Sequence, residues 1–191
     1  LRNLQIAARK YRSATRSGVH VYFVGDESQS GRILDYAIGL KALFGEKLRP
    51  VDEDEPLFII ELPQYGDISS DNVVGISGRV YREFESEDYS RLTIAHELVH
   101  PYVRIPVPNS SPFAALVIEG FPSFFQLWAL KRMDGDFDHM RWMRLKERRY
   151  LEGREAGDPV EKPILEITYG EIGTYKDRFV LSDRVWLFLF A

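Results

Sequence analysis

The feature that most constrains this fold is a pair of histidines four positions apart, with a glutamate directly after the first. His96, Glu97 and His100 form the pattern H-E-x-x-H, and the apolar residues of the surrounding stretch, 89–103, suit a largely buried helix. On a helix, positions i and i+4 share one face, so both imidazoles can bind a single Zn²⁺. A lone histidine on such a face is more often structural, but this spacing, in a chain with only 4 histidines, favours a metal site.

Proline follows the second histidine directly. Pro101 lacks the amide that would bond to the Glu97 carbonyl, so the helix is predicted to kink or end there. The break comes after His100, so the spacing of the histidine pair is preserved.

A second carboxylate follows at a distance that allows a turn and a returning helix. Eighteen residues separate His100 from Glu119, which is the best candidate for a third ligand; the alternative is an ordinary acid in the first turn of a helix. Three protein ligands would leave one position on the zinc open for water. Glu97 is turned by about 100° around the helix from His96. It is therefore expected to accept a proton from that water rather than to bind the metal.

Composition limits the class of protein. The 191 residues suffice for one domain with a real core, or for two lobes around a cleft. A net charge of −4 argues against a general nucleic-acid binder, and the lack of cysteine excludes disulfides and thiolate zinc sites. No apolar run reaches the roughly 18 residues of a membrane span. Because the chain begins at Leu1 and stops within an apolar run, 185–190, we expect a piece of a longer protein with flanking domains; nothing indicates the compartment.

The pattern of apolar residues predicts strands in the first half of the chain and helices in the second. Strands are expected at 20–24, 57–62 and 72–81, and helices at 1–16, 30–44 (ended by Gly45), 89–103, 113–133 and 136–151, with a last apolar unit at 176–190. This order predicts a single α+β domain. Its mixed-sheet α/β lobe, 1–88, would pack on a mainly helical lobe, 89–191, with the metal helix between them.

The two motifs together resemble those of the gluzincin metallopeptidases. H-E-L-V-H, eighteen residues and then E-G-F-P-S-F-F (119–125) are similar to the aminopeptidase N and leukotriene hydrolase type, whose second motif resembles N-E-G-F-A-x-Y. The resemblance covers residues 19–190. It implies a thermolysin-like zincin catalytic domain that acts on a peptide or protein substrate. His96, His100 and Glu119 would bind one Zn²⁺, and Glu97 would be the general base.

The same resemblance implies a tyrosine that stabilises the oxyanion. The stretch 167–171 is similar to the segment of that family, which assigns the role to Tyr169; Tyr175 is the rival, and either could be an ordinary core or surface residue. One motif departs from the family. Where aminopeptidases carry G-x-M-E-N, whose glutamate holds the substrate amine, the stretch 75–79 has no acid, so action on free N-termini is not supported. The strand could still bind an extended peptide by edge pairing.

The leading hypothesis is a zinc-dependent peptidase. The alternative is a zinc-binding, peptidase-like domain with a binding or regulatory role and little catalytic activity.

Overall fold

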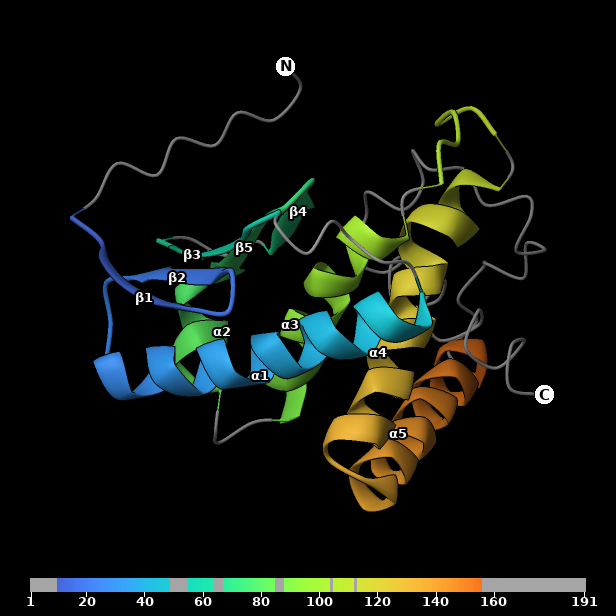
Figure 1. Cartoon of the computed structure of the whole chain (residues 1–191). Coiled ribbons are helices and arrows are strands. Elements are labelled where there is room, and N and C mark those ends of the chain that lie inside the picture. Colours follow the sequence, from blue (N-terminus) through green and yellow to red (C-terminus); the bar gives the residue numbers. More distant parts are fainter. Residues whose placement is uncertain are drawn as a thin grey trace. The chain divides into compact units, whose positions relative to one another are not determined.

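The computed structural model describes residues 10–48, 55–63, 67–84, 88–103, 105–111 and 113–155. The chain divides into two compact units, Leu1–Tyr102 and Val103–Ala191. The first unit combines a mixed sheet with helices, and the second is helical where it is described, so the α+β class is confirmed (Figure 1).

The first unit is built on a five-stranded sheet in the order β1-β2-β3-β5-β4. Its inner strands β2, β3 and β5 are parallel, and its outer strands β1 and β4 are antiparallel to their neighbours. The strands are β1 (Arg12–Arg16), β2 (Val19–Phe23), β3 (Leu57–Leu62), β4 (Ile68–Ser70) and β5 (Val73–Ser77). The helical elements of this unit are α1 (Glu27–Lys47), α2 (Gly78–Arg82), α3 (Asp88–Val99) and the 3₁₀ turn η1 (His100–Tyr102).

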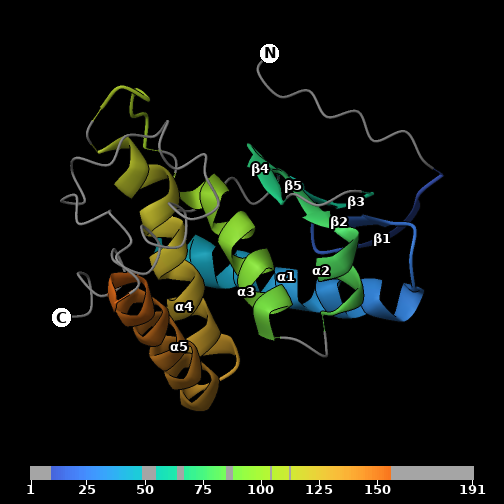
Figure 2. The same ribbon diagram turned by 180° about the vertical axis from the view of Figure 1, so that it is seen from behind.

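One face of this sheet is covered by α1 and α3 (Figures 1 and 2). The burial of side chains alternates along β2, which shows which face of the sheet the helices cover. Val19, Val21 and Phe23 are buried, and the residues between them are half-buried. The helices contribute a matching apolar stripe, which on α1 consists of Ile33, Leu34, Ala37, Leu40 and Phe44. The core of the unit therefore lies between the sheet and these two helices.

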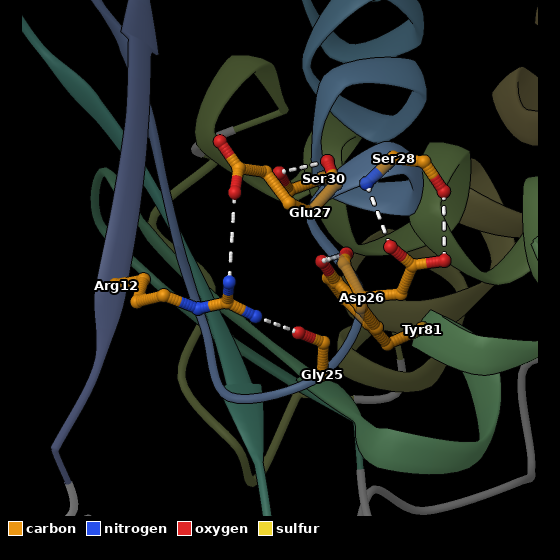
Figure 3. Close-up of polar contacts among 7 residues, drawn as sticks. All are labelled: Arg12, Gly25, Asp26, Glu27, Ser28, Ser30 and Tyr81. Carbon is orange, nitrogen blue, oxygen red and sulfur yellow. Dashed lines mark hydrogen bonds and ion pairs between the residues drawn. The ribbon is translucent and has the colours of Figure 1, made fainter.

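A network of polar contacts fixes the start of α1 (Figure 3). Asp26 is the N-cap and accepts from Ser28 N at 2.9 Å, which satisfies one of the free amides of the first turn. The Tyr81 hydroxyl of α2 donates to the Asp26 carbonyl at 2.7 Å, and Arg12 of β1 donates to the Gly25 carbonyl. The β2–α1 connection is thus tied to both a strand and a second helix.

The buried carboxylate of Glu61 also stabilises the β2–α1 connection. Its Oε2 accepts from Val24 N at 2.7 Å and from Gly25 N at 3.0 Å, and the residue is 8% exposed. A buried carboxylate is normally costly, but here it satisfies two backbone amides that lie beyond the end of β2.

Where it is described, the second unit consists of a π-helical turn and two helices. They are η2 (Leu116–Gly120), α4 (Phe121–Met133) and α5 (Asp136–Glu155), and α4 packs on both neighbours. Gly135, at φ +100°, makes the turn between α4 and α5 in a backbone conformation that favours glycine. Among the helices described in either unit, none combines the length and the apolar character that crossing a membrane requires.

Three sequence predictions about elements are wrong. Arg12–Arg16 is not helical but forms β1, because the tight turn at Ser17 and Gly18, with φ values of +50° and +69°, pairs it with β2. Gly45 does not end α1, which continues to Lys47. The strand predicted at 72–81 ends at Ser77, whose hydroxyl caps α2 by accepting from Val80 N.

The other elements are confirmed where they are described. The predictions at 20–24, 30–44, 57–62, 89–103, 113–133 and 136–151 correspond to β2, α1, β3, α3 with η1, η2 with α4, and α5. The apolar unit predicted at 176–190 lies outside the described residues.

Candidate metal centre

The H-E-x-x-H residues sit at the end of α3, which is held by an apolar face. Leu92, Ile94, Ala95, Leu98 and Val99 are at most 4% exposed, and α3 contacts α1, α2, β4 and β5. Packing of these residues leaves His96 and His100 half-buried on another side of the helix. The packing that buries the apolar side chains of α3 therefore sets the direction of the two imidazoles.

The α-helix ends at Val99, as the position of Pro101 predicts. His100 begins the 3₁₀ turn η1, which runs to Tyr102. Despite this change in winding, the two imidazole rings stay together, with centroids 5.0 Å apart and planes at 78°.

The buried end of this turn is fixed to α1. Tyr102 is 5% exposed and its ring centroid lies 5.5 Å from that of Phe44. Burial raises the pKa of Tyr102 to about 12, with a smaller contribution from the Glu55 carboxylate, so this phenol stays neutral at physiological pH. The turn that carries His100 is therefore anchored by an uncharged, well-packed side chain.

Three potential metal donors converge on this turn. One atom each from His96, Glu97 and His100 lies within 4.8 Å of the other two. Glu97 Oε2 is 4.0 Å from His100 Nε2, and the Glu97 side chain is 11% exposed. Since Zn–N bonds are about 2.0–2.1 Å long, one ion fits between the imidazoles after small side-chain adjustments. Imidazole nitrogens beside a carboxylate are a donor set that zinc prefers.

Glu119 lies in the second unit, on the π-helical turn η2, and is half-buried. Single π-helical turns within α-helices are rare and occur frequently at functional sites. This local distortion singles out the segment that carries Glu119, independently of the sequence motif. The role of Glu119 as third ligand stays a prediction from the spacing.

The candidate oxyanion donors Tyr169 and Tyr175 lie outside the described residues.

The assignment of the edge strand from the sequence is wrong. The stretch 75–79 falls on β5 and the first residues of α2, and β5 is paired on both sides, with β3 and with β4. Beyond β4, no further strand is paired among the described residues. The lack of an acid at 75–79 therefore concerns an inner strand of the sheet. The edge on this side of the sheet is formed by Ile68–Ser70.

Sequence reasoning missed β4 because the strand has only three residues, two of them serines. A signal was present in Asp71 and Asn72, since these residue types tolerate the left-handed conformation of tight turns. Asp71 indeed has a φ of +51° between β4 and β5. Figure 2 shows the resulting hairpin at the end of the sheet, and β4 contacts both α3 and η1.

Comparison with known proteins supports the fold. No protein-family model matches the sequence, and no curated protein matches it. Among solved structures, the chain is similar to native leukotriene A4 hydrolase from Saccharomyces cerevisiae, with a TM-score of 0.68 and 16% sequence identity. The match covers 94% of this chain and 30% of that chain, so the present sequence spans less than a third of its neighbour. At this level of identity, the likeness shows a shared fold.

Proposed function

We propose that this chain is the catalytic domain of a zinc-dependent peptidase with a thermolysin-like fold. The observation that carries the proposal is the convergence of His96, Glu97 and His100 at the end of α3. Similarity in fold to leukotriene A4 hydrolase supports it. His96 and His100 would hold one zinc ion together with Glu119, whose place on a π-helical turn favours a functional role.

Glu97 performs the proton transfers. Bound zinc would lower the pKa of a coordinated water from about 15.7 to about 7 and polarise the scissile carbonyl. The Glu97 carboxylate accepts a proton from the attacking water and delivers it to the leaving nitrogen. Water is thereby added across the C–N bond, which gives a carboxylic acid and an amine. Tyr169 is the candidate hydrogen-bond donor to the oxyanion, with Tyr175 as the alternative.

The edge strand β4 supplies a place for the substrate. Its outer edge carries no paired strand among the described residues, and β4 contacts α3 and η1, which carry the histidines. An extended peptide can add to such an edge through main-chain hydrogen bonds, which select for peptides over other substrates.

The test combines metal analysis with peptide hydrolysis. We expect the native chain to hold one zinc and to cleave members of a peptide library detected by mass spectrometry. Glu97→Gln should keep the zinc and lose activity by about 10²–10⁴-fold, the usual contribution of a general base. Glu46→Gln, at a side chain on α1 that is 66% exposed, is the matched control and should keep both.

Other outcomes separate the alternatives. Zinc without hydrolysis of any peptide would identify a binding or regulatory domain instead of an enzyme. Absence of zinc from the native chain would refute both functions. Cleavage of matched peptides with free and acetylated N-termini would distinguish exopeptidase from endopeptidase action.

A further inference from the structure

The middle residue of the edge strand, Ser69, faces the helices. It lies opposite Val74 of β5, and the register continues through Ile59 of β3 to Val21 of β2. Val74, Ile59 and Val21 are all 0% exposed, in the core between the sheet and the helices. Because residues in one cross-strand row share a face, Ser69 extends this buried row to the edge of the sheet.

This end of the sheet lies against the metal helix. The strand β4 contacts both α3 and the turn η1, which begins at His100. A polar side chain on the helix-facing side of β4 therefore points towards the segment that carries the second histidine.

The Ser69 hydroxyl is buried and has no hydrogen-bond partner among the described residues. Its Oγ is sealed from solvent and makes no hydrogen bond to the residues that the structure describes. Native proteins pair nearly all such groups with protein atoms or ordered water. Since the oxygen is sealed from solvent, a protein group or a trapped water suits it better than a substrate does.

We propose that Ser69 is a positioning residue for the metal centre, an inference that rests on the proposed zinc site. The Ser69 oxygen accepts, through one trapped water, the N–H of the His100 ring nitrogen that does not bind the metal. Histidines that bind a metal usually donate their other N–H to an acceptor, which fixes the ring orientation and strengthens the ligand. A hydroxyl has the acceptor lone pairs for this role.

The test compares two substitutions of nearly identical shape. Ser69→Thr keeps a hydroxyl and Ser69→Val replaces it with a methyl group. Zinc affinity is measured by competition with a chromophoric chelator, and the melting temperature is measured without metal. We expect Ser69→Val to bind zinc about 10-fold or more weakly than Ser69→Thr. Its metal-free melting temperature should not be lower than that of Ser69→Thr, because without zinc the His100 ring is not fixed in the orientation that pairs with the hydroxyl.

Ser70 provides the matched control. It is exposed and, as the next residue of β4, lies on the opposite face of the sheet. Ser70→Thr and Ser70→Val should bind zinc equally well. If Ser69→Val does not fold, Ser69→Ala compared with the native chain measures the same hydroxyl.

Two results would overturn this inference while leaving the proposed function intact. One is zinc bound equally tightly by Ser69→Thr and Ser69→Val. The other is a metal-free melting temperature that falls in Ser69→Val in step with zinc affinity, which would mark Ser69 as a packing residue only. A native chain that binds no zinc would instead refute the proposed function itself.

Discussion

Replacement of the buried carboxylate of Glu61 should destabilise the first unit strongly. In Glu61→Ala, the amides of Val24 and Gly25 lose the acceptor they now share at 2.7 and 3.0 Å. Each hydrogen bond to a charged group contributes about 1.5–3 kcal/mol, so the expected loss for the two bonds is about 3–6 kcal/mol. Water cannot readily replace the acceptor, because Glu61 is only 8% exposed.

Glu61→Gln separates the acceptor from its charge. Both amides donate to the same oxygen, Oε2, so a single amide oxygen can take over both bonds. The substitution removes only the benefit of the negative charge, and the expected loss is about 1 kcal/mol. The difference between the two variants therefore measures the hydrogen bonds themselves.

The assay is urea denaturation of the metal-free chain, followed by far-UV circular dichroism. Amide hydrogen exchange at Val24 and Gly25 gives a local readout, since both should exchange faster in Glu61→Ala. Glu27→Ala, at a side chain that is 79% exposed, should change the free energy of unfolding by less than about 0.5 kcal/mol. A loss below about 1 kcal/mol in Glu61→Ala, or equal losses in both Glu61 variants, would refute the reasoning.

Four further predictions concern other positions. Gly31→Ala in α1 should raise the free energy of unfolding by about 0.5–1 kcal/mol, because an added Cβ meets nothing within 4 Å. Gly18→Ala should lower it, since φ is +69° there; thermal denaturation checks both signs. Burial raises the pKa of Tyr81, so the folded chain holds this proton more tightly than the unfolded chain. The free energy of unfolding should therefore fall as pH rises above about 10, and it should fall less in Tyr81→Phe. Urea titrations at pH 8–11 measure this, and an equal fall in both chains would contradict the reasoning. Glu119→Ala should weaken zinc binding by at least roughly 10–100-fold, the usual loss when a residue that hydrogen-bonds to a metal ligand is removed. An unchanged zinc affinity in chelator competition would exclude Glu119 as a ligand.

Periodic apolar patterns made much of the fold predictable. The helices α1, α3 and α4 bury apolar residues at helical spacing, and β2 and β3 are rich in β-branched and aromatic residues. Errors arose where pairing with distant residues overrides local preference. The stretch 1–16 has apolar residues at helical spacing, yet its end, Arg12–Arg16, pairs with β2 because the turn at Ser17 and Gly18 brings the two segments together.

The sheet edge shows most clearly why part of the candidate site escaped prediction. A three-residue strand with two serines has no recognisable periodicity of apolar residues. Its position at the edge of the sheet depends on how the other strands pair, which local sequence does not show. Ser69 gains its significance only from the cross-strand row that ends in it and from the contact of β4 with η1.

The sequence by itself determined the metal-binding pattern. The spacing of His96 and His100 and the helix-ending Pro101 are local, because backbone geometry alone places residues i and i+4 on one face. Only the tertiary structure decided which strand borders that helix. Strand order depends on hydrogen bonds between segments far apart in the chain, and no local pattern at Ile68–Ser70 encodes them.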